Sequence, residues 1–188
     1  MAAVGLVASA CAAKTPAVGT SGSPANGGTM VVELSSDPGS FNPAVSTSGI
    51  VRAAAAPIYL ALTHLSSTFQ AEPELATSWS SSDGGEVWTF QLRQGVEWSD
   101  GQPFSSADVV YSFNDVLLPY HPTTHADLAP ITKSVTANGP DSVVFTFTQP
   151  VANLPGRVSY TEAPILPQHI YQGTNPLTAP ANLHPVGK

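Results

Sequence analysis

Short runs of alternating apolar and polar residues predict β-strands in the middle of the chain. In the run 87–92, Trp88, Phe90 and Leu92 occupy every second position, and successive side chains of a strand point to opposite faces. The sequence Ser-Asp-Gly-Gly at 82–85 stands just before this run. Since Gly and Asp favour tight turns, we predict a hairpin whose second strand buries the three large side chains.

A second hairpin is predicted further along the chain. Residues 131–137 and 142–147 are rich in β-branched and aromatic residues, and Asn-Gly-Pro-Asp at 138–141 supplies the turn between them. Two other apolar runs, 29–34 and 163–166, are short enough to be buried strands. We therefore expect two hairpins and two single strands.

One helix is strongly indicated after residue 105. Ser105, with Asp108 three residues later, fits a helix N-cap followed by an acidic residue in the first turn. The residues that follow are apolar at helical spacing, so the helix should bury one face, made of Val109, Val110, Phe113, Val116 and Leu117.

The remaining segments give weaker signals. Residues 50–62 have helical spacing with Pro57 inside, so this helix is kinked or begins near the proline. Residues 167–171 resemble one short helix. The segments 35–49 and 118–130 contain turn dipeptides or prolines and are predicted to be loops.

Composition narrows the class of protein. With 188 residues, the chain holds one domain, or one and part of another. Only 10% of residues are charged, and 13 acidic against 6 basic residues give a net charge of -7. Nucleic-acid binding is excluded because phosphate contacts need Lys and Arg. The single cysteine excludes an internal disulfide and a cysteine-based zinc site.

The first 28 residues differ from the rest. An apolar run at 4–10 is followed by Cys11, which resembles the signal of a bacterial lipoprotein, so we interpret 1–11 as a signal and Cys11 as the lipidation site. An apolar N-terminus with a buried free cysteine is the alternative. Residues 12–28 contain Val18 as their only large apolar side chain, so a flexible tether is expected there.

The most distinctive stretch is residues 73–112, which read PELATSWSSSDGGEVWTFQLRQGVEWSDGQPFSSADVVYS. This stretch closely resembles the family 5 solute-binding proteins of ATP-binding-cassette importers, a family of peptide and nickel binders. Asp37-Pro38 and Asn42-Pro43 are similar to the family's early "DP…DP" loop, with Asn42 in place of the usual Asp. The segments PQHIY at 167–171 and PVG at 185–187 resemble its "PKHIY" and the start of its "PVGTGPF".

The resemblance implies an α/β (α+β) protein with the two-lobed type II periplasmic-binding-protein fold, of which this chain is the N-terminal part only. Residues 29–45 would begin lobe I. Residues 46–149 would form an inserted subdomain on the lobe I side, and residues 150–188 would return to lobe I, which is truncated there. The opposite wall of the binding cleft would then follow Lys188.

The resemblance also implies function. The protein would be an extracytoplasmic, lipid-anchored or periplasmic component that binds an oligopeptide or dipeptide by hinged closure and delivers it to a permease driven by an ATPase. It would use no cofactor and catalyse nothing. A nickel, heme or oligosaccharide binder of the same family, and a truncated surface scaffold without a transport role, are the alternatives.

Ligand contacts are expected by position in the loop after the second "DP" and, more weakly, in 119–125. The first loop supplies neutral hydrogen-bonding groups that suit a peptide main chain, from Ser46, Thr47, Ser48 and Gly49; the second supplies Tyr120 and His125. Ser46 to Ser48 are equally compatible with capping the helix that follows. The tryptophans and Phe104 are expected in the core, with stacking on a ligand as the alternative.

Other chemistry finds little support in the sequence. His121 and His125 are four residues apart, a spacing that suits zinc on a helix, but Pro122 lies between them and no third ligand is near. The sequence holds no G-x-S-x-G, H-E-x-x-H or P-loop motif. We therefore predict neither a metal site nor an enzyme.

Overall fold

The structure is a computed structural model that describes residue 31 and residues 33–187. Contacts divide the chain into Met1–Glu33 and Leu34–Lys188, and the account below concerns the second unit. The predicted signal with Cys11 and the predicted tether 12–28 lie outside the described residues. Of the strand expected at 29–34, the described residues Val31, Glu33 and Leu34 are in no strand.

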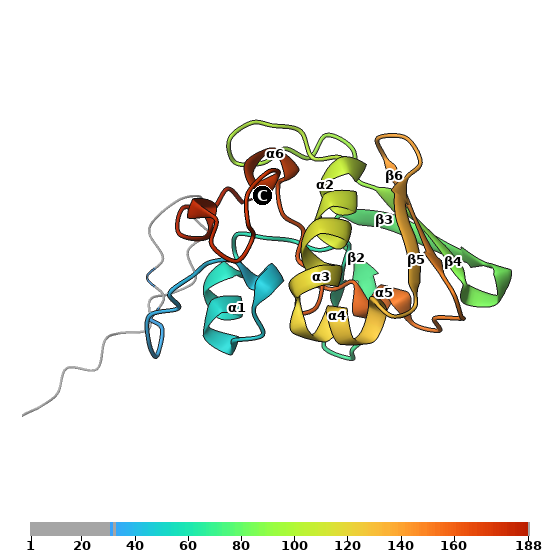
Figure 1. Cartoon of the computed structure of the whole chain (residues 1–188), viewed down its shortest axis with the longest axis horizontal. Coiled ribbons are helices and arrows are strands. Elements are labelled where there is room, and N and C mark those ends of the chain that lie inside the picture. Colours follow the sequence, from blue (N-terminus) through green and yellow to red (C-terminus); the bar gives the residue numbers. More distant parts are fainter. Residues whose placement is uncertain (1–30, 32, 188) are drawn as a thin grey trace, which may run out of the picture. The chain divides into compact units, whose positions relative to one another are not determined.

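A four-stranded antiparallel sheet is the main β-structure (Figure 1). It contains β3 (Ala76–Ser82), β4 (Val87–Leu92), β5 (Thr132–Ala137) and β6 (Ser142–Phe147) in the order β3-β4-β6-β5. Both predicted hairpins are confirmed. The first is closed by a 3-10 turn, η2 (Asp83–Gly85), in which all three residues have positive φ angles, and two glycines accept that conformation without a steric penalty.

The sheet buries one face through aromatic contacts. Trp88, Phe90 and Leu92 on β4 are buried, as the alternation predicted. Phe90 meets Phe145 edge-to-face at 5.5 Å between ring centroids, and Phe145 meets Phe113 of the neighbouring helical segment at 4.8 Å. This edge-to-face geometry is the favoured one for aromatic pairs, so the three rings join the sheet to the helices that cover it.

A nearly continuous helical stretch packs on this face. It comprises α2 (Ser106–Tyr111), the π-helical segment η3 (Ser112–Leu117), α3 (Leu118–Tyr120) and α4 (Pro122–Leu128). The predicted cap is confirmed, because the Ser105 hydroxyl accepts the Ala107 N–H and the Asp108 carboxylate accepts the Ser105 N–H. Of the apolar face, Val110 alone is only half-buried.

The loop predicted at 118–130 was wrong, because α3 and α4 occupy most of it. Its prolines do not oppose helix formation where they stand. Pro122 is the first residue of α4, where proline is tolerated since that N–H has no partner within the helix. Pro119 instead lies inside the continuous stretch, directly after the π-helical segment. Pro122 therefore starts a helix, and Pro119 does not end one.

The smaller elements connect this body. They are η1 (Pro43–Val45), α1 (Gly49–Ala55), β1 (Thr63–Leu65), β2 (Ala71–Pro73), α5 (Leu154–Arg157), α6 (Gln168–Tyr171) and η4 (Pro180–Asn182), with β1 and β2 paired antiparallel. The helix expected over 50–62 is shorter than predicted. It ends at Ala55, ahead of Pro57, and Tyr59 to Leu62 run on without helical structure.

The strand predicted at 163–166 was also wrong. These residues are buried, as the apolar run indicated, but their backbone N–H groups bond to partners in different segments of the chain. Ile165 donates to the Leu60 carbonyl, whereas Leu166 donates to the Ser112 hydroxyl. A strand needs a repeated ladder with one neighbour, and this segment has none. The helix predicted at 167–171 is confirmed as α6.

Asn42 has a structural explanation. Its side chain is fully buried, its amide donates to Asn182 Oδ1 at 2.9 Å and to the Pro176 carbonyl at 3.3 Å, and its Oδ1 accepts the Ala44 N–H at 3.0 Å. A carboxylate at this position would lack the two donors. The amide thus fastens η1 to the segment before η4.

Asp108→Ala is expected to lower the free energy of unfolding by about 3 kcal/mol, because two backbone N–H groups would lose their acceptor. In the protein Asp108 is buried, and its two oxygens accept the Ser105 N–H at 2.9 Å and the Gln168 N–H at 2.8 Å. Urea unfolding of the full-length protein measures the loss, with exposed Asp127→Ala as control. Equal stability of the two variants would contradict this role.

Candidate functional site

The loop that the family resemblance indicated as a ligand contact leads into α1. Ser46 is half-buried, whereas Thr47, Ser48 and Gly49 are exposed. Ser48 occupies the N-cap position, yet its hydroxyl makes no capping bond, and the Ser46 hydroxyl accepts the Ser48 N–H at 3.2 Å. The side-chain capping expected as the alternative role is therefore not made, which leaves the Ser48 hydroxyl available.

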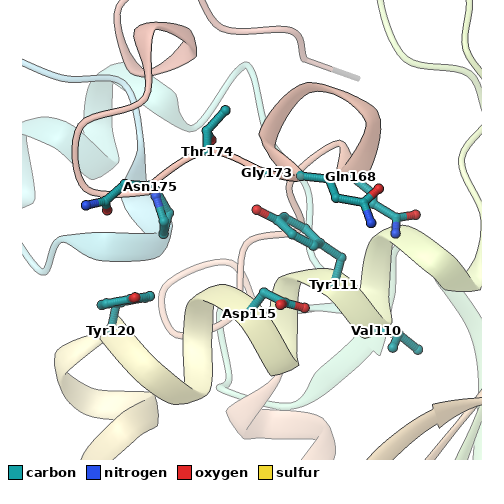
Figure 2. Close-up of a pocket in the computed structure, with 10 residues that line it drawn as sticks. Val110, Tyr111, Asp115, Tyr120, Gln168, Gly173, Thr174 and Asn175 are labelled. Carbon is teal, nitrogen blue, oxygen red and sulfur yellow. The ribbon is translucent and has the colours of Figure 1, made fainter.

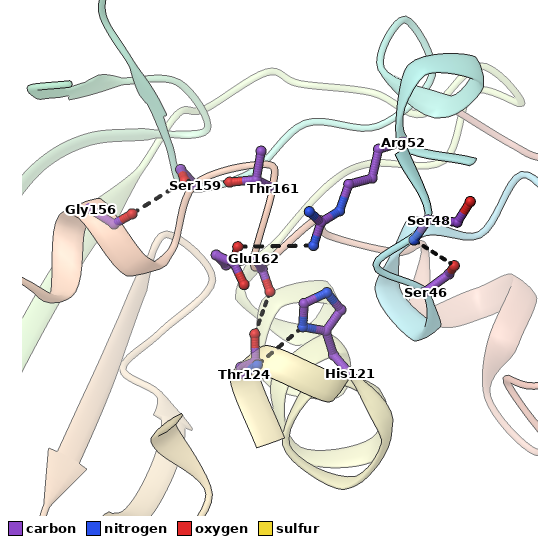
Figure 3. Close-up of polar contacts among 9 residues, drawn as sticks. All are labelled: Ser46, Ser48, Arg52, His121, Thr124, Gly156, Ser159, Thr161 and Glu162. Carbon is purple, nitrogen blue, oxygen red and sulfur yellow. Dashed lines mark hydrogen bonds and ion pairs between the residues drawn. The ribbon is translucent and has the colours of Figure 1, made fainter. Parts of the chain in front are cut away.

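Arg52, three residues after this loop, forms a polar cluster with His121 and Glu162 (Figure 3). Arg52 comes from α1, His121 caps α4, and Glu162 belongs to the segment before α6. Arg52 Nη2 and Glu162 Oε1 are 3.9 Å apart, an ion pair too long for a hydrogen bond. The Tyr160 hydroxyl donates to the Arg52 carbonyl at 2.7 Å and fixes the backbone of α1.

His121 is the buried member of the cluster. Its side chain is fully buried, and its Nδ1 accepts the Thr124 N–H at 3.2 Å. Because Nδ1 accepts, the neutral ring carries its proton on Nε2. Burial, and secondly the positive charge of Arg52, lower the pKa of His121 to about 4, so the ring is neutral near pH 7.

Four inner atoms of the cluster have no hydrogen-bond partner among the described residues. They are the donors Arg52 Nε, Arg52 Nη2 and His121 Nε2, and the acceptor Glu162 Oε2. Unpaired buried polar atoms are uncommon and call for a water, an ion or a ligand. The side chains of Arg52 and Glu162 are still 22% and 30% exposed. The cluster can thus interact with one group that both accepts and donates hydrogen bonds.

A separate groove of about 490 Å³ lies between the helical stretch and the segment that contains α6 (Figure 2). Tyr111, Asp115 and Tyr120 line it from the helices, and Gln168 of α6 and residues 172–176 after it line the other side. In Figure 2 the Tyr111 ring extends from α2 into the hollow below Thr174. Its volume falls in the range of small-molecule sites.

The structure separates the predicted site residues. Tyr120 lines the groove, but Ser46, Thr47, Ser48, Gly49 and His125 do not. His125 is exposed, and its Nδ1 lies 2.6 Å from the Leu118 carbonyl, so the ring fastens α4 to the preceding turn. Within the described part of the chain, no group of three or more His, Cys, Asp or Glu side chains is placed to hold a metal ion.

Sequence reasoning missed Arg52, Glu162, Tyr111 and Asp115. A signal for Arg52 was present, because it is the one basic residue between Lys14 and Arg93, and it follows the polar loop by three residues. Glu162 had no such signal, since it reaches Arg52 only through the folding of a segment 110 positions away. The tyrosine was expected within a helix but not at a groove.

Comparison with known proteins assigns this chain to a family. The model for "Bacterial extracellular solute-binding proteins, family 5 Middle" matches residues 70–187, more than half of the chain. The chain belongs to family 5 of the bacterial extracellular solute-binding proteins. This membership confirms the resemblance that the 73–112 stretch carried.

Two curated relatives illustrate the relationship. Protein XP55 of Streptomyces lividans is 30% identical over 186 residues, which is 96% of this chain and 32% of the relative. The dipeptide-binding protein of Escherichia coli strain K12 is 36% identical over 104 residues, which is 50% of this chain and 19% of the relative. This family 5 chain therefore spans about a third or less of these relatives.

A solved structure supports the fold. The periplasmic binding protein DppA from Helicobacter pylori, in complex with the peptide STSA, superposes with a TM-score of 0.67 at 29% identity, covering 79% of this chain and 33% of that one. The predicted fold class, part of a type II periplasmic binding protein, is confirmed. Within the described residues of this family member, no helix has the length and apolarity to cross a bilayer.

His121→Asn is expected to remove an acid-sensitive component of stability. The folded-state pKa of His121 is lowered to about 4 from 6.5, so the unfolded chain binds the extra proton first as the pH falls. The contribution of His121 to the free energy of unfolding has its full value above pH 6.5. It decreases toward pH 4, by about 3 kcal/mol at most. Asn retains an oxygen for the Thr124 N–H but does not titrate.

Urea unfolding at pH 7, 6, 5 and 4 tests this expectation. The variant should show a shallower decrease than the wild type, whereas His184→Asn, at an exposed position, should follow the wild type. Parallel curves for all three proteins would contradict the neutral, buried state of His121.

Proposed function

We propose that this chain is part of an extracytoplasmic solute-binding protein that delivers oligopeptides or dipeptides to the permease of an ATP-binding-cassette importer. Family 5 membership and the peptide named with the Helicobacter pylori structure support this function. The observation that carries it is the loop 46–49, which is exposed at residues 47–49 and leads directly into α1, the helix that carries Arg52 with its unpaired polar atoms.

The chemistry of the loop suits a peptide backbone. A peptide main chain presents N–H donors and C=O acceptors and no charge between its ends, and Ser46, Thr47 and Ser48 can donate and accept through one atom each. Gly49 lets a ligand approach its backbone, because no described atom beyond its chain neighbours and its own helix backbone lies within 4 Å of where its Cβ would stand. Tyr120 and His125 are the weaker proposed contacts.

Binding and release of the solute would require the opposite wall of the binding cleft. We propose that the lobe carrying this loop closes on the solute by hinge motion, a frequent device for enclosing ligands, and that the residue ranges 29–45, 46–149 and 150–188 divide between lobe I and its inserted subdomain. The protein would bind its solute without changing it covalently. Energy for transport would come from a separate ATPase.

Gly49→Ala is expected to weaken peptide binding at least about tenfold while leaving the fold intact. The added methyl group meets no described atom within 4 Å beyond its chain neighbours and its own helix backbone, and Gly49 does not have a positive φ angle. It would instead occupy the space that a bound main chain needs. Isothermal titration calorimetry of the full-length protein with di-, tri- and pentapeptides measures the affinity.

The control for this experiment is Ser67→Ala, in an exposed turn, which should bind as the wild type does. If the Gly49→Ala variant bound peptides with the affinity of the wild type, the loop 46–49 would not be part of the binding site. Binding of sugars but of no peptide by the wild-type protein would refute the peptide assignment and leave the family unchanged.

Cys11→Ser is expected to release the protein from the membrane. We propose that Cys11 is lipidated, since it follows a short apolar run and small residues. Removing its thiol removes the attachment point, so the variant should lose palmitate labelling and appear in the soluble fraction. Continued labelling of the variant would show that the lipid is attached at another residue.

A further inference from the structure

The groove beside α2 contains a tyrosine hydroxyl with no hydrogen-bond partner among the described residues. Tyr111 as a whole is 6% exposed, but its hydroxyl oxygen is not one of the buried unpaired atoms, so the hydroxyl is accessible from the groove. Figure 2 shows the hydroxyl directed into the hollow and Asp115 beside the same ring. Tyr59 and Tyr171 pair with each other at 3.3 Å, so Tyr111 differs from its buried neighbours.

The residues around this hydroxyl select for positive charge. Asp115 supplies the one carboxylate in the lining of the groove, and no Lys, Arg or His side chain lines the groove. Tyr111 and Tyr120 add aromatic rings, which attract cations through their faces. Gln168, Gln172 and Asn175 add amide oxygens that accept hydrogen bonds. An anion would find no charged partner here.

A metal ion does not fit the same residues. Calcium and zinc take several carboxylate, imidazole or thiolate ligands, and the groove offers a single carboxylate. An organic ammonium group has other needs. It presents three N–H donors, which a carboxylate, a phenol oxygen and an amide oxygen can accept, and its carbon chain can lie on the rings.

We propose that this groove is a binding site for the primary ammonium group of a linear aliphatic amine, such as the end of a lysine side chain. Asp115 supplies the charge partner, the Tyr111 hydroxyl accepts one N–H, and Tyr120 covers the alkyl chain at the outer edge. The site shares only Tyr120 with the proposed peptide contacts and does not depend on the loop 46–49.

The state of Tyr111 agrees with this role. Burial, and secondly the Asp115 carboxylate, raise the pKa of Tyr111, so the phenol stays protonated and keeps both its donor and its acceptor at neutral pH. The Asp115 carboxylate that has this effect is the same group that would hold the ammonium ion.

The test uses n-butylammonium chloride as the probe and n-butanol as its uncharged counterpart. The full-length protein, with ring-labelled tyrosine, is titrated at constant ionic strength and followed by nuclear magnetic resonance. The ammonium ion should shift the resonances of Tyr111 and Tyr120 in a saturable way and leave those of Tyr59 and Tyr171 unchanged. Butanol should bind at least about tenfold more weakly, because it lacks the charge.

Asp115→Asn should reduce the affinity for butylammonium about tenfold or more, since the carboxylate becomes a neutral amide of the same shape. Asp127→Asn on nearby α4 makes the same change in net charge outside the groove and should bind as the wild type does. Tyr111→Phe should bind more weakly than the wild type. Because Asp115 is exposed, its variant is expected to keep the fold, which circular dichroism checks.

Three results would overturn the proposal: equal affinity for butanol and butylammonium, unchanged binding by Asp115→Asn, or equal losses in the Asp115 and Asp127 variants. These results are independent of peptide binding. A protein that binds peptides but not butylammonium keeps the proposed function and loses this site, and a protein that binds only butylammonium shows the reverse.

Discussion

The contact between Phe145 and Phe113 is the interaction on which the arrangement of both candidate sites depends. Phe145 lies on a central strand of the sheet and Phe113 on the helical stretch, and their rings meet edge-to-face at 4.8 Å. Tyr111 and Asp115 flank Phe113 in sequence, and His121 follows eight residues later. The orientation of that stretch on the sheet therefore determines where the groove opens and where the polar cluster forms.

Local patterns were sufficient to predict the elements of this body. The alternation of Trp88, Phe90 and Leu92 gave a strand with its correct buried face, and Ser105 with Asp108 gave a helix start that the structure reproduces in detail. These features depend on neighbours within a few residues. Errors arose where proline was taken as a helix breaker at 118–130 and where burial was taken as evidence for a strand at 163–166.

The sites were harder to predict because they are assembled from distant segments. The loop 46–49 was found by its place in a family pattern, but Glu162, the ion-pair partner of Arg52, is more than a hundred residues away in sequence. The same is true of the groove, where Asp115 faces residues 172–176. No local sequence pattern encodes contacts between segments so far apart, so only a family resemblance or the folded structure can reveal them.

The π-helical segment affects which side chains of the helical stretch line the groove. The Leu118 N–H donates to the Phe113 carbonyl, five residues back, so this segment accommodates one residue more than an α-helical path would. One extra residue turns everything after it by about 100° around the axis. The insertion thus turns Tyr120, nine residues after Tyr111, toward the side of the helix from which Tyr111 and Asp115 line the groove.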